Sequence, residues 1–162
     1  MPESWPHCRP IATRDDDARA AMKFWDCSAV MPLLADEPAR EQMLGLLQRD
    51  PEVIIWWGTP VEIASALARR ERENLLTADE VSIALSTARA LTESWHEIVP
   101  SDAVRRAAER LLRAHALRAA DSLQLGAALI GADHDPSNLE MVCLDARLSS
   151  AARREGFTVL DR

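Results

Sequence analysis

The stretch Phe24-Trp25-Asp26-Cys27-Ser28-Ala29-Val30 decides the fold that the sequence predicts. Its apolar residues predict a short buried strand over residues 23–27, and a short helix should follow over about residues 29–34. Asp26 lies at the end of that strand, with the Ser28 hydroxyl two residues further on. A buried carboxylate is costly unless it is paired or bound to a metal. Asp26 is therefore the first candidate site residue.

Strands and helices are expected to alternate along the rest of the chain. Apolar runs predict further strands at residues 53–57, 97–99, 141–144 and 157–160. Helical patterns are predicted at residues 38–49, 59–72, 77–91, 101–112, 120–130 and 146–155. The run at 53–57 is apolar throughout, as expected for a strand that is covered on both faces. This order predicts an α/β fold in which helices flank a parallel sheet.

The size and composition of the chain set limits on its class. A chain of 162 residues suits one domain, expected over residues 22–162. Residues 1–21 are rich in proline and aspartate and are interpreted as a flexible leader or a mis-assigned start. No apolar run approaches the ~20 residues of a membrane span, and no secretory signal opens the chain, so a cytoplasmic protein is expected. The net charge of -7 argues against strong non-specific binding to nucleic acid.

Cysteine and histidine offer little chemistry in this sequence. The three cysteines lack metal-ligand spacing, and Cys27 and Cys143 are interpreted as buried thiols. His115 is expected on the surface, and no serine or cysteine has a clear histidine partner for nucleophilic catalysis. A basic stripe is formed by arginines 105, 106, 110 and 113. It is interpreted as a solvated face, which does not exclude contact with RNA.

Three further carboxylates are expected to join Asp26 at one edge of the sheet. Asp145 is predicted at the end of a strand, as Asp26 is, whereas Glu62 and Asp121 are predicted in the first turns of helices. In parallel sheets flanked by helices, ligands bind beyond the carboxyl ends of the strands. Clustered carboxylate oxygens suit Mg²⁺ or Mn²⁺. The four side chains therefore predict a divalent-metal site.

Hydrolysis of a phosphodiester bond is the chemistry that such a site would support. A bound divalent ion activates water and stabilises the charge that develops on phosphate. Ser28 is expected to hydrogen-bond Asp26. Arg118 and Arg147 lie close in sequence to acidic residues of the set and are expected to contact phosphate groups of the substrate. RNA is the predicted substrate.

The same carboxylates also have structural interpretations. Glu62 with Thr59 matches a capping box, in which Thr59 caps the helix. Asp121 is a good helix cap and suits the positive end of the helix dipole, and Asp145 is a candidate cap for the helix that follows it. Taken singly, these three residues favour the structural interpretation, whereas Asp26 is harder to explain in that way. Spacing alone leaves both interpretations open.

Four segments together resemble the motifs of PIN-domain proteins, in particular the VapC-type toxins of bacterial toxin–antitoxin systems. They are residues 22–30, 59–67, 117–128 and 142–148, and Gly156-Phe157 then leads into a last strand. The likeness covers about residues 22–161. It implies a three-layer α/β/α fold with a central, mainly parallel sheet. The sequence departs from the family pattern at Cys27, where the family often has a hydroxyl residue, and at Ser122, where the family often has alanine.

The resemblance also implies an activity and partners. It implies a Mg²⁺-dependent endoribonuclease toxin, with Mn²⁺ as a substitute, whose catalytic and metal-binding residues are Asp26, Glu62, Asp121 and Asp145. It further implies a homodimer and a small cognate antitoxin protein that blocks the site.

Two other functions compete with the ribonuclease. One is a catalytically silent PIN-like module that binds RNA or a protein partner. The complete set of carboxylates argues against it, and metal binding would distinguish the two. The other is a phosphatase of the aspartyl-phosphate type. That chemistry usually needs a second aspartate two residues after the nucleophile, where this chain has Ser28.

Overall fold

A five-stranded parallel sheet runs through the middle of the molecule. The computed structural model describes residues 22–161, and the predicted leader lies outside them. The strands are β1 (Lys23–Trp25), β2 (Val53–Trp56), β3 (His96–Ile98), β4 (Glu140–Val142) and β5 (Val159–Leu160). Their spatial order is β3-β2-β1-β4-β5, and each neighbouring pair is parallel. The parallel α/β fold predicted from the sequence is confirmed.

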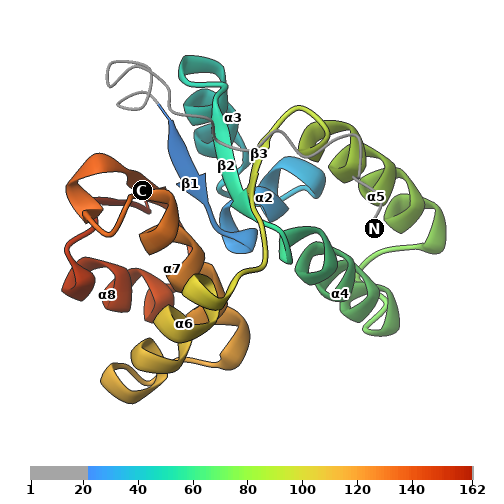
Figure 1. Ribbon diagram of the computed structural model, residues 1–162. Coiled ribbons are helices and arrows are strands. Elements are labelled where there is room, and N and C mark those ends of the chain that lie inside the picture. The colour runs from blue at the N-terminus through green and yellow to red at the C-terminus, as the bar shows by residue number, and fades with distance from the viewer. Residues whose placement is uncertain (1–21, 162) are drawn as a thin grey trace, which may run out of the picture.

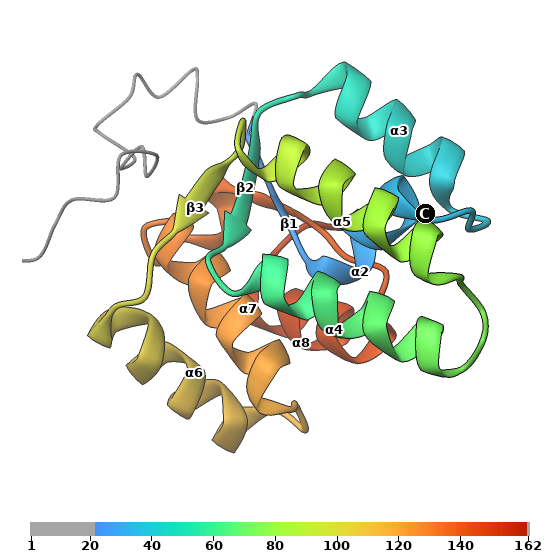
Figure 2. The ribbon, with the colours of Figure 1, turned by 90° about the vertical axis from the view of Figure 1, so that its right-hand side faces the viewer.

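Helices cover both faces of this sheet (Figures 1 and 2). One face carries α6 (Asp102–Ala114), α7 (Ala119–Gly131) and α8 (Ala146–Glu155). The other carries α2 (Cys27–Leu34), α3 (Arg40–Arg49), α4 (Thr59–Arg72) and α5 (Ala78–Thr92). A short 3-10 helix, η1 (Pro136–Asn138), precedes β4. The result is the expected three-layer α/β/α arrangement. Within residues 22–161, no helix is both long and apolar enough to span a membrane.

The buried residues of the central strands are apolar because their side chains enter two separate cores. In β1, Phe24 packs on the side of α6, α7 and α8, whereas Trp25 packs on the side of α2 to α5, and neither is exposed. Burial of a large apolar side chain contributes about 1.5–3 kcal/mol. Trp57 differs from the prediction of a doubly covered strand at 53–57, because its side chain is 52% exposed. The strand ends at Trp56.

Helix starts also differ in detail from the sequence prediction. β1 ends before Asp26, which has an extended backbone and is the N-cap of α2. The prediction that Thr59 caps α4 is wrong. Gly58 holds the cap position, and Thr59 is the first helical residue with its side chain buried. A Cβ atom on Gly58 would lie 2.5 Å from the indole nitrogen of Trp56, so a larger residue here would force a shift of its surroundings.

Candidate active site

Asp26 lies at the carboxyl end of the central strand and is 4% exposed. Its Oδ2 atom accepts hydrogen bonds from the backbone N–H of Ser28 at 3.0 Å and from the Ser28 hydroxyl at 2.5 Å. The Cys143 thiol donates to the same oxygen at 3.6 Å. Burial raises the pKa of Asp26 above its ordinary value, although the hydrogen bonds from Ser28 oppose this effect. Asp26 is therefore a buried carboxyl group whose charge the protein compensates only in part.

Ser28 connects Asp26 to the segment that follows the neighbouring strand β4. Its hydroxyl oxygen accepts the backbone N–H of Leu144 at 2.9 Å and that of Asp145 at 3.1 Å. Asp145 is exposed, and its Oδ1 atom accepts the backbone N–H of Leu148 at 2.8 Å. Asp145 thus caps α8, as its structural interpretation predicts. It also lies at the edge of the sheet that holds Asp26.

Glu62 lies in the first turn of α4 and contacts the opposite helix layer. Its Oε1 atom accepts a hydrogen bond from Nε2 of Gln124 at 3.1 Å. The capping box expected between Glu62 and Thr59 is absent, because the helix start has no side-chain cap. Burial, with the negative charges of Asp26 and Asp121, raises the pKa of Glu62 to about 7. Glu62 therefore belongs electrostatically with the other acidic residues.

Asp121 lies in the first turn of α7. Arg118 and not Asp121 holds the cap position, so the interpretation of Asp121 as the helix cap is wrong. The Oδ2 atom of Asp121 accepts the backbone N–H of Arg118 at 3.3 Å and so stabilises the helix start from within the first turn. Its negative charge adds to the rise in pKa of both Asp26 and Glu62. This structural role and the functional interpretation of Asp121 are compatible, since one carboxylate oxygen serves the helix start.

The structure thus brings the four predicted carboxylates to one edge of the sheet. We call Asp26, Glu62, Asp121 and Asp145 the carboxylate set. None of the four forms an ion pair with Lys, Arg or His within residues 22–161. In the same part of the chain, no three His, Cys, Asp or Glu side chains already converge into a metal-ligand group. The donor chemistry fits Mg²⁺ or Mn²⁺, because both ions prefer oxygen ligands.

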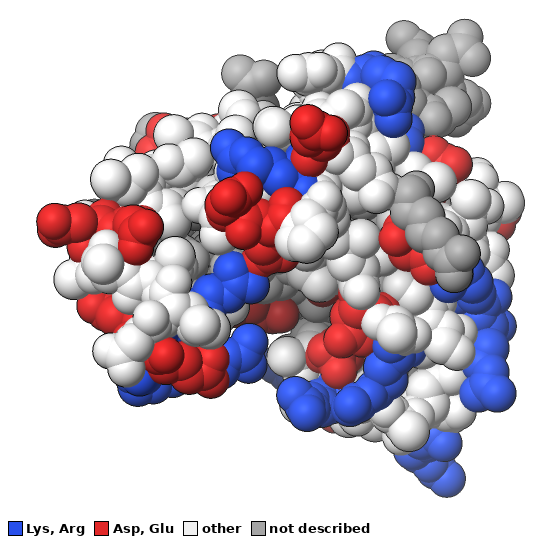
Figure 3. Space-filling model, turned by 180° about the vertical axis from the view of Figure 1, so that it is seen from behind, with Lys and Arg blue, Asp and Glu red and all other residues white. Residues whose placement is uncertain are grey.

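The two arginines predicted to contact substrate flank this set. Arg118 is the N-cap of α7 and Arg147 lies in the first turn of α8, and both are exposed. On the face shown in Figure 3, acidic and basic side chains are interspersed and form no broad basic surface.

Gln124 is a site residue that the sequence analysis missed. It lies on α7, is fully buried, and donates from Nε2 to Glu62 and to the Thr59 hydroxyl, each at 3.1 Å. The sequence did contain a signal for it: Gln124 is the one polar side chain among the apolar and small residues at positions 123–131. Such a residue needs a hydrogen-bond partner when it is buried.

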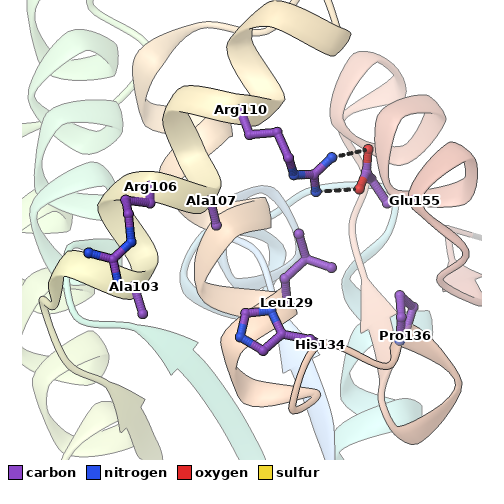
Figure 4. Close-up of a pocket in the computed structure, with 8 residues that line it drawn as sticks. All are labelled: Ala103, Arg106, Ala107, Arg110, Leu129, His134, Pro136 and Glu155. Atoms are coloured by element: carbon purple, nitrogen blue, oxygen red, sulfur yellow. Dashed lines mark hydrogen bonds and ion pairs between the residues drawn. The ribbon is translucent and has the colours of Figure 1, made fainter.

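A cavity lies away from the carboxylate set, between α6, α8 and the end of α7, and none of the four carboxylates lines it (Figure 4). It has a volume of about 410 Å³. Arg110 pairs there with Glu155 at 2.6 Å, and His115 contacts the same carboxylate at 2.7 Å. The expectation that His115 is a surface residue is wrong, because its side chain is only 8% exposed. The basic stripe of α6 is therefore partly neutralised by Glu155.

Comparison with known proteins adds no family assignment. The chain matches no protein-family model and no curated protein sequence. The resemblance to PIN-domain proteins stays a prediction, and the site is assessed on its own geometry.

Proposed function

We propose that the protein is a Mg²⁺- or Mn²⁺-dependent endoribonuclease that uses the carboxylate set. The observation that carries this proposal is the buried Asp26 carboxyl group, which lies with Glu62 and Asp121 in one acidic cluster. The negative charge of Asp121 raises the pKa of the other two, and no cation within residues 22–161 pairs with any of them. A bound divalent cation would remove this repulsion.

The hydrogen bonds of the carboxylate set leave oxygen atoms for a cation. Within residues 22–161, each of the four side chains accepts hydrogen bonds at one oxygen only. The second oxygen of each accepts no hydrogen bond from residues 22–161. The internal bond fixes the side chain, and the second oxygen is available as a hard ligand.

Each residue has a distinct role in the proposed reaction. A divalent ion supplies the Lewis-acid chemistry that activates water and stabilises charge on the phosphodiester. Ser28 holds Asp26 in place and fixes the backbone of Asp145 through its hydroxyl oxygen. Arg118 and Arg147 are exposed beside the set and are the groups that would bind substrate phosphates.

The partners and location belong to the same proposal. A homodimer, a small antitoxin protein that blocks the carboxylate set, and a cytoplasmic location are implied by the resemblance to VapC-type toxins. The silent PIN-like module that binds RNA or protein is the competing function. It predicts that the carboxylate set has no catalytic use.

Incubation of the purified chain with a mixed pool of tRNA, rRNA and mRNA tests the proposal. Parallel reactions contain Mg²⁺, Mn²⁺ or EDTA. We expect cleavage with either metal and none with EDTA. RNA binding without cleavage under all three conditions would favour the silent module.

A further inference from the structure

Gln124 connects the two helices that carry Glu62 and Asp121. Its Nε2 atom donates to Thr59 Oγ1 and to Glu62 Oε1, and both acceptors lie in the first turn of α4. Gln124 itself lies one turn after Asp121 on α7. One side-chain amide therefore spans the two helix starts that contribute acidic residues to the candidate site.

Two residues of α7, Asp121 and Gln124, have opposite effects on the pKa of Glu62. The negative charge of Asp121 raises the pKa of Glu62, whereas the hydrogen bond from Gln124 lowers it. Residues three apart on a helix lie on the same face. The same turn of α7 thus supplies a neighbouring carboxylate and the donor that favours the ionised form of Glu62.

Packing alone does not account for an amide at this position. Gln124 is fully buried, and its Oε1 atom has no hydrogen-bond partner among the described residues. An unpaired buried carbonyl oxygen costs free energy. Methionine would fill a similar volume without that cost. The two Nε2 hydrogen bonds are therefore the feature that distinguishes Gln124 from an apolar core residue.

The orientation of the amide agrees with an ionised Glu62. A carboxylate only accepts hydrogen bonds, so it requires the NH₂ group of the amide on its side. The reverse orientation would place Oε1 of Gln124 against Oε1 of Glu62. Thr59 helps to fix this orientation, because its buried hydroxyl accepts a second hydrogen bond from Nε2 of Gln124.

We propose that Gln124, anchored by Thr59, is the positioning residue that fixes Glu62 for metal binding. It holds Oε1 of Glu62 and leaves Oε2 for the cation. The proposal rests on the proposed metal site. Residues that hold metal ligands in this way typically contribute 10–100-fold to metal affinity.

Calorimetric titration of the intact chain with Mn²⁺ tests this role without RNA. We expect Gln124→Met to bind Mn²⁺ roughly 10–100-fold more weakly than the unaltered protein. Ser122→Ala is the matched control. Ser122 is also buried on α7, but its hydroxyl donates to the backbone oxygen of Ala119 and, within residues 22–161, forms no hydrogen bond with a member of the carboxylate set. Its Mn²⁺ affinity should be unchanged.

A double-mutant cycle separates positioning from a general loss of structure. Gln124→Met should have little further effect on Mn²⁺ affinity when Glu62→Gln is already present. Combined with Asp145→Asn, it should retain its full effect. An equal effect in both backgrounds would mean that Gln124 acts through the fold and not through Glu62.

The outcomes also distinguish this inference from the proposed function. If the unaltered chain binds no Mn²⁺, the metal site and the role of Gln124 both fail. If it binds Mn²⁺ and Gln124→Met binds it equally well, only the role of Gln124 fails. Should Gln124→Met not fold, Thr59→Val removes the anchor alone and should weaken Mn²⁺ binding to a smaller extent. Unchanged affinity in that variant would overturn the proposal.

Discussion

The hydroxyl oxygen of Ser28 accepts the backbone N–H of Asp145 at 3.1 Å, although the two residues are 117 positions apart. The same hydroxyl donates to Asp26 and accepts the backbone N–H of Leu144. One small side chain thus holds together the ends of two neighbouring strands.

Ser28→Ala should therefore destabilise the protein and disturb the carboxylate set. Loss of the hydroxyl leaves the partly buried backbone N–H of Leu144 without its acceptor, and an unpaired buried group costs about 1–3 kcal/mol. The N–H of Asp145 lies at an exposed position and can bond to water instead. Urea unfolding measures the change. Ser86→Ala, at an exposed position of α5, is the control and should have little effect. Equal stability of both variants would contradict the bridging role of Ser28.

Glu62 should make the metal-free protein less stable as the pH rises. Its pKa is raised from the ordinary value of 4.5 to about 7, so the folded protein binds more protons than the unfolded chain in this range. Stability then falls as the pH increases from about 4.5 to 7 and changes little above that. Glu62→Gln removes this titration.

The pH effect is measured as a difference between two proteins. In EDTA, the stability of the unaltered chain relative to Glu62→Gln should decrease between pH 4.5 and pH 7. Glu109→Gln, at an exposed position of α6, should follow the unaltered chain. A constant difference across this range would show that Glu62 has an ordinary pKa.

The proposed metal site predicts that Mg²⁺ stabilises the folded protein, because the ion would bind the carboxylate set and not the unfolded chain. At a concentration 100 times the dissociation constant, one site contributes about 2.7 kcal/mol. For a chain of this size, that corresponds to a rise in melting temperature of roughly 5–10 °C. The rise should be lost in Asp26→Asn and kept in Glu109→Gln. An equal rise in all three proteins would place the metal elsewhere.

Gly58→Ala should destabilise the start of α4. The added Cβ atom would lie 2.5 Å from the Trp56 indole nitrogen, so the indole or the backbone must move. Overpacking of this kind costs about 1–3 kcal/mol. Gly45→Ala is the matched control, since its Cβ atom would approach only Arg49, at 3.4 Å. Thermal unfolding should show a loss for the first variant and little change or a gain for the second.

The fold could be predicted because each strand and helix is specified by a pattern of apolar residues that are close together in the sequence. The apolar residues of β2 predict a strand covered on both faces, and the alternation with helices predicts a parallel sheet. The carboxyl ends of such strands share one edge, so Asp26 and Asp145 could be expected close together. Strand order could not be predicted, because it depends on contacts between distant segments.

The details of the site depend on those distant contacts. Thr59 matched a helix cap, but its hydroxyl is turned to Gln124, 65 positions away. Trp57 continued an apolar run, yet it extends past the covered part of the sheet. His115 was expected on the surface, but Glu155 at the end of α8 contacts it and its side chain is buried. In each case tertiary packing decided what the local pattern left open.

Cleavage of RNA by the unaltered chain and by Asp26→Asn, purified in parallel, is the most direct test of the central claim. The substitution keeps the size of the buried side chain and removes its charge. With Mg²⁺ present, we predict that the unaltered protein cuts RNA and that Asp26→Asn does not, although both remain folded. Glu109→Gln should cut at the rate of the unaltered protein. Equal cleavage by Asp26→Asn would contradict the account, because the buried carboxylate at the end of β1 would then have no part in the reaction.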